Sequence, residues 1–426
     1  MTIDPASISR HTAGMNPFPV CDGELQVDGL PLSEFAERVG RTPFYVYDSG
    51  RIGERIAALR ARQPAAIAIH YALKANPFPP LLRFMASRVD GIDIASAGEL
   101  RLALDAGVNP AHISFAGPGK RSEELEQAVT AGALVNAESP NELARLADVA
   151  RRTGRIARVA LRVNPAFELK GSGMRMGGGP RPFGIDEEAI PALFADWHRF
   201  GDGLAFEGFH IFAGSQNLDG NAIAATQQAS YQLALRLGAT APGPVRTLNL
   251  GGGFGIPYFP HESALDLGPV AAALAEIAAD AAQRLPHAEL CIELGRYLVG
   301  EAGLYVTRIV DKKISRGQTY LVTDGGLNHH LAASGNLGQV IRRNYPVAIG
   351  NRMANPAKVG VRDTAATSVT TVVGPLCTPL DVLAERVSLP EAEIGDLFVI
   401  FQSGAYGASA SPLGFLSHPP VTEWLV

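Results

Sequence analysis

The segment "AIAIHYALKANPFPPLLRFMASRVDGIDIASAGELRLALDAG" (residues 66–107) alternates between two local patterns. The short apolar run 66–76 predicts a strand, and the Leu-rich stretch 79–88 predicts a helix. The same pair follows at once, with a strand over 89–96 and a helix over 97–107. Strand–helix pairs in direct succession are typical of a parallel sheet covered by helices, so this segment predicts an α/β fold.

The same alternation continues from about Pro43 to Gly300. It makes roughly eight strand-then-helix steps in about 250 residues, the count and length of a (β/α)8 TIM barrel. Doubly wound sheets show the same alternation but seldom need so many steps. We therefore expect a barrel domain over 43–300, with strand candidates at 42–48, 66–76, 89–96, 112–118, 133–139, 156–165, 205–214, 245–255 and 289–296.

The pattern changes after Gly300. Four β-rich stretches, with few helical segments between them, predict a second, mainly antiparallel β domain over 301–426. Residues 1–42 include a hairpin-and-helix pattern at 24–40, and we expect this segment to pack on the β domain. The Gly-rich stretch "GSGMRMGGGPRPFGID" (171–186) predicts a long loop at the mouth of the barrel.

The composition excludes several classes of function. The chain is 46% hydrophobic and 19% charged, and its net charge of −5 with a pI near 6.1 argues against nucleic acid as a partner. Cys21, Cys291 and Cys377 have no CxxC spacing, so they predict neither a disulfide framework nor a metal site. The N-terminus has no signal-peptide pattern, and no apolar stretch is long enough to span a membrane. We therefore expect a cytoplasmic protein with no membrane partner.

Lys74 stands in the apolar run that ends the strand at 66–76. A buried ammonium group is costly unless it is paired, neutralised or used covalently. One interpretation is a lysine whose stem is buried while its charged end reaches water. The other is an amine held to form a Schiff base with an aldehyde cofactor.

Two later strand ends carry groups suited to an anionic cofactor. "LNLGGGFG" (248–255) places three glycines where backbone N–H groups could surround a phosphate, although a simple tight turn explains them equally well. A barrel favours the phosphate, because its late strand-end loops commonly bind one. "CIELGR" (291–296) ends with Glu293 and Arg296. Glu293 could form a surface ion pair or keep a pyridine nitrogen protonated, and Arg296 would add positive charge to a phosphate site.

Two candidates lie in the expected β domain. Cys377 occurs in "GPLCTPLD" (374–381), and most free cysteines are small buried hydrophobes. Tyr406 occurs in "QSGAYGASAS" (402–411), where it suits a phosphate contact or an ordinary turn. The local sequence alone does not decide the role of either residue.

The order of these motifs resembles the fold-type III pyridoxal-phosphate decarboxylases, the family of diaminopimelate, ornithine and arginine decarboxylases. The lysine motif "YALKAN", the glycine run, Glu-x-Gly-Arg, the cysteine and "AYGA" follow one another in the family's order. "GIDIASAGEL" (91–100), "LRVNP" (161–165) and "FGID" (183–186) also match. The resemblance implies a barrel that binds pyridoxal 5'-phosphate and an enzyme that decarboxylates an amino acid.

The resemblance also implies roles for individual residues. Lys74 would be catalytic as the Schiff-base lysine, and Glu293 would pair with the pyridine nitrogen. Cys377 would be catalytic by reaching into the neighbouring subunit of a homodimer, where it returns a proton to Cα. The other implied cofactor contacts are Asp93, Arg162, His210, Phe212, Ser215, Gly251, Gly252, Gly253, Arg296 and Tyr406. The implied substrate contacts are Thr378, Asp381, His329 and His330.

Three departures from the family pattern concern the substrate. The family usually has a stacking histidine at the position of Phe212, whose ring can stack but cannot hydrogen-bond. It commonly has an acidic residue at the position of Thr378. The diaminopimelate enzymes carry an Arg-Pro pair after the "DGG" motif, where this chain has His329 and His330. These departures make diaminopimelate and free basic amino acids poorer candidates.

The same departures resemble a subgroup associated with exopolysaccharide (exosortase A) loci and with butirosin biosynthesis. In the butirosin case, the resemblance implies decarboxylation of glutamate tethered to an acyl carrier protein. Three alternatives stay open: a decarboxylase of a free amino acid, an alanine-racemase-like enzyme, and a non-catalytic regulator that binds pyridoxal phosphate. Racemases of that type generally place an arginine at the pyridine nitrogen, so Glu293 argues against them. The presence of Lys74 and Cys377 argues against a regulator.

Overall fold

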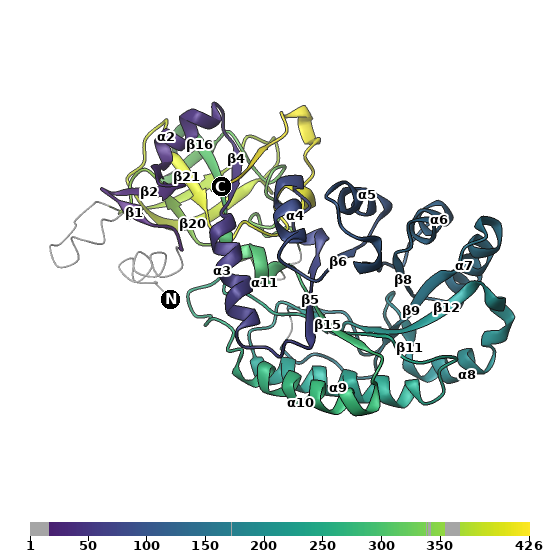
Figure 1. Cartoon of the computed structure of the whole chain (residues 1–426). Coiled ribbons are helices and arrows are strands. Elements are labelled where there is room, and N and C mark those ends of the chain that lie inside the picture. Colours follow the sequence, from purple (N-terminus) through teal and green to yellow (C-terminus); the bar gives the residue numbers. More distant parts are fainter. Residues whose placement is uncertain (1–16, 172, 338, 340–341, 354–366) are drawn as a thin grey trace. The chain divides into compact units, whose positions relative to one another are not determined.

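The computed structural model describes residues 17–426 except 172, 338, 340–341 and 354–366 (Figure 1). The chain divides into two compact units. One, here called the barrel unit, comprises Gly53–Ile256 and Ala264–Leu298. The other, here called the β unit, comprises the described part of Met1–Ile52, with Pro257–Ser263 and Val299–Val426.

The barrel unit contains a closed ring of eight parallel strands. They pair in the order β9-β12-β14-β15-β5-β6-β7-β8, and β8 pairs with β9 to close the ring. This closure confirms the predicted (β/α)8 barrel. The strands are β5 (Ile67–Ala72), β6 (Gly91–Ile94), β7 (Ile113–Phe115), β8 (Leu134–Ala137), β9 (Ala157–Asn164), β12 (Leu204–Ile211), β14 (Thr247–Gly252) and β15 (Glu289–Leu294).

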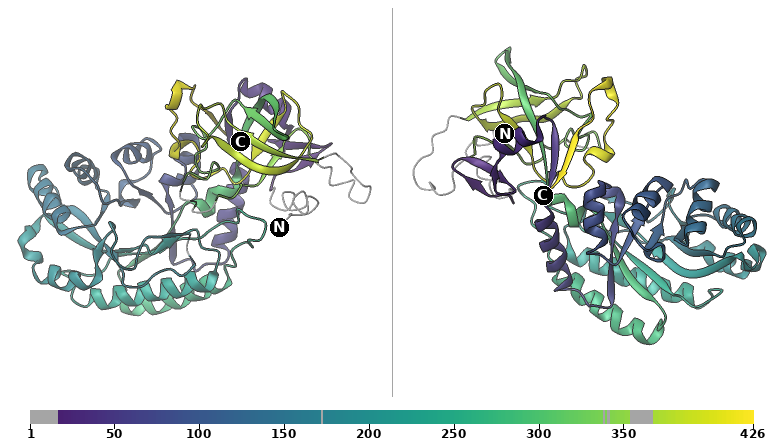
Figure 2. Two further views of the ribbon diagram at one scale, coloured as in Figure 1. Left: turned by 180° about the vertical axis from the view of Figure 1, so that it is seen from behind. Right: turned by 45° about the horizontal axis from the view of Figure 1, so that its top comes forward.

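Helices connect the barrel strands, and Figures 1 and 2 show α9 and α10 side by side along the outside of the barrel. Local sequence signals set where the helices begin and end. In α7, for example, the Ser139 side chain accepts a hydrogen bond from the Glu142 N–H, Pro140 opens the helix, and Gly154 follows its end at φ +63°. The helices are α3 (Ser49–Arg60), α4 (Pro79–Ala86), α5 (Ala97–Asp105), α6 (Ser122–Ala131), α7 (Pro140–Thr153), α8 (Ile190–Ala195), α9 (Gly220–Gly238), α10 (Gly268–Arg284) and α11 (Arg296–Val299).

The barrel strands bury polar side chains as well as apolar ones. In β9, Val159, Leu161 and Val163 are buried apolar residues, and they alternate with positions that include Arg162. Most of the other strands also carry a buried polar residue. The set is Asp93, Ser114, Asn136, Arg162, His210, Asn249 and Glu293. These residues occur where barrels usually place Val, Ile and Leu, which marks the interior of this barrel as a functional region.

The β unit is built on an eight-stranded sheet in which most neighbours are antiparallel, as predicted. Phe44, Val46, Leu304, Val399 and Phe401 belong to its apolar core. The strands of this sheet are β4 (Phe44–Tyr47), β16 (Gly303–Ser315), β17 (Gln318–Thr323), β18 (Val347–Ile349), β19 (Thr367–Val373), β20 (Val382–Pro390), β21 (Leu397–Ile400) and β22 (Thr422–Leu425).

The predicted strand at 42–48 forms but belongs to the other sheet. We expected it to open the barrel, whereas β4 pairs with β16 and β22 of the β unit. A strand of four buried residues fits either sheet, so its local pattern could not identify its neighbours. The predicted hairpin and helix at 24–40 are present, as β1 (Val20–Cys21), β2 (Glu24–Val27), β3 (Leu30–Pro31) and α2 (Leu32–Val39). Residues 1–16 lie outside the described residues.

The segment 165–184, here called the mouth loop, follows β9. It is not wholly irregular, because β10 (Met174–Arg175) pairs with β13 (Gly214–Ser215). Its end leads into β11 (Ile185–Asp186), which adds to the barrel sheet beside β9. Among the residues that the structure describes, no helix has both the length and the apolar character needed to cross a membrane.

Candidate active site

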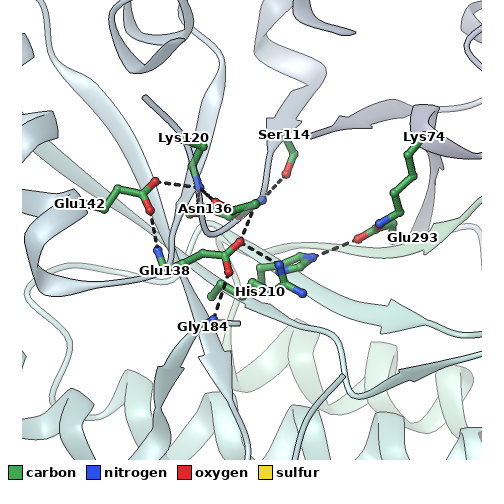
Figure 3. A network of polar contacts seen from close by, with 11 residues as sticks. Lys74, Ser114, Lys120, Asn136, Glu138, Glu142, Gly184, His210 and Glu293 are labelled. Atoms are coloured by element: carbon green, nitrogen blue, oxygen red, sulfur yellow. Dashed lines mark hydrogen bonds and ion pairs between the residues drawn. The ribbon is translucent and has the colours of Figure 1, made fainter. Parts of the chain in front are cut away.

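Lys74, Glu293 and His210 come together at the carboxyl ends of the barrel strands (Figure 3). Lys74 lies in the single turn of 3-10 helix Leu73–Ala75 that directly follows β5. Its Nζ donates a hydrogen bond to Glu293 Oε1 at 3.1 Å, and His210 Nε2 lies 3.0 Å from the other oxygen, Oε2. One carboxylate at the end of β15 therefore joins an amine and an imidazole from two other strands.

Glu293 is held in its ionised form. Its side chain is 5% exposed, and burial alone would raise its pKa. The charge of Lys74 and the hydrogen bonds from His210 and Lys74 outweigh burial and lower the pKa of Glu293 far below its usual range. The barrel therefore keeps a negative charge at a site with little access to water.

Lys74 is less buried than its sequence context suggested. Its neighbours Leu73 and Ala75 are buried, but 47% of its own side chain is exposed. Lys74 lies just past the strand end, in the turn Leu73–Ala75, and its amine pairs with the buried Glu293 carboxylate. The half-exposed amine is therefore accessible, and it is paired with a carboxylate.

Phe212 occupies the place predicted for a stacking ring. Its ring is nearly parallel to that of His210, with an interplanar angle of 5° and 6.5 Å between centroids. The Lys74 Nζ lies 5.5 Å from the centre of the Phe212 ring. A flat aromatic face thus lies close to the amine, as a planar cofactor ring would require.

The three glycines at the end of β14, Gly251–Gly253, pack against neighbouring backbone too closely for side chains. A Cβ on Gly252 would lie 1.8 Å from the carbonyl oxygen of Glu293, and one on Gly253 would lie 2.4 Å from that of Gly214. Gly251 and Gly253 also have φ values of +73° and +80°. The glycines therefore bring bare backbone beside Gly214 and Glu293, which suits a phosphate cradle. Ser215 adjoins this backbone in β13, and Arg296 begins α11 just after β15.

Asp93 lies in β6 and pairs with His70, which no sequence motif marked as a site residue. His70 Nδ1 is 3.2 Å from Asp93 Oδ1, while the buried Asp93 Oδ2 has no hydrogen-bond partner within the described part of the chain. Burial would lower the pKa of His70, but the charge and hydrogen bond of Asp93 reverse this and raise it. Asp93 Oδ2 can therefore still accept a hydrogen bond inside the barrel.

Arg162 is held by a buried carboxylate that was also not predicted. Its Nη1 donates to Glu138 Oε1 at 2.8 Å, and its guanidinium carbon lies 5.0 Å from the centre of the Phe183 ring. Nearby, Lys120 Nζ lies 2.7 Å from Glu142 Oε1 in a second buried ion pair (Figure 3). An acidic residue directly after a barrel strand was the available signal for Glu138, because the active sites of barrels lie at that edge.

The remaining candidates lie in the β unit. Cys377 is an exposed free thiol in the turn after β19. Thr378 beside it is half-buried, and its N–H donates to the Leu376 carbonyl at 2.8 Å. Tyr406 is half-buried and has φ +54°. These three side chains are accessible at least in part.

Asp381, His329 and His330 differ from the expectation that they contact the substrate. Asp381 is buried and accepts hydrogen bonds from the N–H groups of Leu327 and Leu376 at 2.6 and 2.8 Å. Its carboxylate thus holds two loops together, and its burial raises its pKa. It has a structural role in this structure.

The two histidines are also part of the β-unit core. His330 Nε2 is 2.9 Å from Ser403 Oγ, and its Nδ1 accepts the Ala333 N–H at 3.3 Å. His329 is buried, and its Nε2 donates to the Pro419 carbonyl at 3.0 Å. Their place after "DGG" predicted a substrate role. In the structure both nitrogens of His330 and the Nε2 of His329 bond to protein atoms, while His329 Nδ1 has no hydrogen-bond partner among the described residues.

Comparison with known proteins gives a consistent result. Residues 49–300 match the family described as pyridoxal-dependent decarboxylase, pyridoxal binding domain. The chain is 38% identical to L-glutamyl-[BtrI acyl-carrier protein] decarboxylase of Niallia circulans, over 94% of this chain and 92% of that protein. It is 33% identical to the diaminopimelate decarboxylase of Aquifex aeolicus, over 92% of this chain and 88% of that protein.

A solved structure shows the same architecture. Diaminopimelate decarboxylase from Helicobacter pylori, complexed with L-lysine, matches with a TM-score of 0.79 and 28% identity. The match covers 92% of this chain and 94% of that chain. The likeness therefore extends over both units.

Proposed function

Since this chain belongs to the pyridoxal-dependent decarboxylases and acts as an amino acid decarboxylase with pyridoxal phosphate, we propose that its substrate is an amino acid tethered to a carrier protein. The observation that carries the chemistry is the ionised, buried Glu293 between Lys74 and His210. The relative whose name states a carrier-bound glutamyl substrate supports the choice of substrate.

The described residues fit the cofactor. The backbone N–H groups of Gly252 and Gly253, with Ser215, would hold a phosphate, since no side chain has room beside the glycine run and the Gly251 N–H already donates to Asn249 Oδ1 at 2.8 Å. Phe212 and His210 offer flat faces at the level of Lys74, whose amine is placed to form a Schiff base. Arg296 would complete the phosphate site, while Asp93 and Arg162 would line the rest of the cofactor site. Bound pyridoxal phosphate supplies the ring that accepts the electrons of the broken Cα–carboxylate bond.

The protein's own groups would then direct the protons. Glu293, kept ionised, would hold a proton on the pyridine nitrogen and so preserve the positive charge that makes the ring an electron acceptor. Lys74 would give up its place to the substrate amine and take it back after carbon dioxide leaves. Cys377 Sγ would deliver a proton to Cα.

We further propose a homodimer with shared active sites. The exposed thiol of Cys377 and the 59% exposed side chain of Leu380 on the same turn support it, since a second copy could cover this turn and receive the thiol. Thr378, adjacent to the thiol, is the candidate for contact with the substrate.

Comparing substrates tests this function. Carbon dioxide release would be measured from L-glutamate as a thioester on a purified acyl carrier protein, from free L-glutamate and from free diaminopimelate. We expect the carrier-bound amino acid to have the higher kcat/KM by roughly tenfold or more, because binding energy from the carrier can be used at the reacting carbon. Lys74→Ala is the inactive control.

Three other results of the substrate comparison would each contradict a different part of the proposal. Faster turnover of either free amino acid would refute the carrier-bound substrate. Inversion at Cα without carbon dioxide release would refute decarboxylation and favour a racemase. Neither reaction with any of the three compounds would favour a non-catalytic protein.

We also propose that the enzyme works in the cytoplasm. Cys21, Cys291 and Cys377 are free thiols, and Cys377 must stay reduced for its role. Fractionation of the native host, with activity measured in each fraction, would test this location.

A further inference from the structure

Glu138 joins three separate segments at the rim of the barrel (Figure 3). It directly follows β8, and its carboxylate is 2% exposed. Oε1 accepts hydrogen bonds from the Gly117 N–H at 2.5 Å and from Arg162 at 2.8 Å. Oε2 accepts one from the Gly184 N–H at 3.1 Å. These donors belong to the loop after β7, to strand β9 and to the last residue of the mouth loop.

The charge of Glu138 makes these bonds strong. Burial would raise its pKa, but the positive charges of Arg162 and Lys120 outweigh burial and lower it. The carboxylate is therefore ionised while it accepts all three hydrogen bonds. Hydrogen bonds to a charged acceptor are about twice as strong as those between neutral groups.

The end of the mouth loop fits closely against β9. Gly184 has φ +75°, and a Cβ there would lie 2.9 Å from the Arg162 carbonyl oxygen. The Phe183 ring packs over the Arg162 guanidinium. The Glu138 carboxylate thus holds both the end of the mouth loop and Arg162, on which that end packs.

The middle of the mouth loop is attached elsewhere. The N–H groups of Met176 and Gly177 both donate to the Ala213 carbonyl, at 3.0 and 3.1 Å. This contact lies beside Ser215, one of the proposed phosphate ligands. The loop therefore borders the proposed cofactor site at both attachments, and Glu138 contributes a charged acceptor to the second of them, at Gly184.

We propose that Glu138 is a positioning residue that holds the end of the mouth loop and Arg162 in place, so that the loop can form one wall of the substrate site. The assignment of that wall to a substrate rests on the proposed function. The anchoring itself rests on the hydrogen bonds alone.

The test compares Glu138→Gln with Glu124→Gln in the holoenzyme. Glu124 is also a buried carboxylate, and it accepts hydrogen bonds from the Ala97 and Arg121 N–H groups without touching the mouth loop. Trypsin can cut the mouth loop after Lys170 or Arg175, and mass spectrometry identifies the cut. We expect Glu138→Gln to be cut there roughly tenfold faster or more, the factor for losing a charge-assisted hydrogen bond. Glu124→Gln should be cut at the wild-type rate.

Kinetics separates positioning from general weakening of the fold. We expect KM for the turned-over substrate to rise roughly tenfold in Glu138→Gln while kcat changes about threefold or less, because the bond-breaking groups stay in place. Equal cleavage rates and equal KM values for the two variants would overturn the proposal. If the wild type decarboxylates nothing, the proposed function fails, and the cleavage comparison still decides the role of Glu138.

A second variant covers the case in which Glu138→Gln does not fold. Phe183→Ala changes a half-buried ring and leaves Glu138 intact. We expect cleavage in the mouth loop to accelerate about threefold or more, since the loop end loses its packing on Arg162. An unchanged cleavage rate would contradict the proposed anchoring.

Discussion

At the scale of single residues, the site depends on which groups are charged. Lys74 was identifiable from its motif, and Glu293 from its place at a strand end. Their partners were harder to find, because His210 and Glu293 are 83 positions apart and Glu138 and Arg162 are 24 apart. Contacts of that kind follow from closing the barrel, which no local pattern encodes.

The first prediction concerns the charge of Glu293. Glu293→Gln should lower kcat by about 10- to 100-fold, because a neutral amide cannot keep the pyridine nitrogen protonated and the charge-assisted hydrogen bond is lost. Carbon dioxide release and the visible absorbance of the bound cofactor would be followed together. Glu276→Gln makes the same chemical change on the outer helix α10 and should leave both unchanged. A fully active Glu293→Gln enzyme would contradict the role given to this carboxylate.

The second prediction concerns acid stability. Burial lowers the pKa of His330 to about 3, so the folded protein keeps this ring neutral while the unfolded chain protonates it near its usual value. Stability is therefore fully present above about pH 6.5 and is lost as the pH falls toward 3. Between pH 7.5 and 5.5 the loss should be about 1.4 kcal/mol.

Urea unfolding at the two pH values would measure this loss. His330→Gln should show a smaller decrease in unfolding free energy over the same interval. His198→Gln removes an exposed histidine and should behave like the wild type. Equal pH dependence in wild type and His330→Gln would show that other groups control acid unfolding.

At the scale of elements, the strand–helix alternation was enough to predict the barrel and the change to a β unit. It could not place β4, since pairing with β16 and β22 joins segments far apart in the chain. It also could not show that His329 and His330 are buried in the β unit. Tertiary contacts, rather than local propensity, decided both.

The third prediction concerns the glycine run at the end of β14. Gly252→Ala should destabilise the protein by about 1–3 kcal/mol, because its Cβ meets the Glu293 carbonyl and forces β14 and β15 apart. It should also weaken the binding of pyridoxal phosphate, measured by titrating the apoenzyme. Gly243→Ala is the matched control, since a Cβ there meets nothing within 4 Å. Equal cofactor affinity in the two variants would argue against a cradle at this bend.

At the scale of the whole molecule, the barrel unit and the β unit carry different parts of the proposed chemistry. Lys74 and Glu293 belong to the first, and Cys377 belongs to the second. The match to a solved decarboxylase structure extends over both units, while the family match covers residues 49–300. The homodimer stays a prediction, because it concerns contacts between two chains.

The fourth prediction tests shared sites. Lys74→Ala and Cys377→Ala should each lose activity as pure proteins. Mixed and allowed to exchange subunits, they should recover about a quarter of the wild-type rate, since half of the dimers are mixed and each of those has one intact site. Sedimentation analysis would establish the dimer independently. No recovery despite subunit exchange would place Cys377 in its own chain's site.

The polar interior of the barrel has a consequence for protein engineering. Residues such as Asp93, Asn136, Arg162 and Glu293 replace the aliphatic filling of an ordinary barrel, and several are held by ion pairs rather than by packing. Refilling this centre with leucine or valine would remove the reactive groups along with the charges. A more heat-tolerant enzyme would therefore have to come from redesigning the outer helices, with the polar residues of the barrel interior kept unchanged.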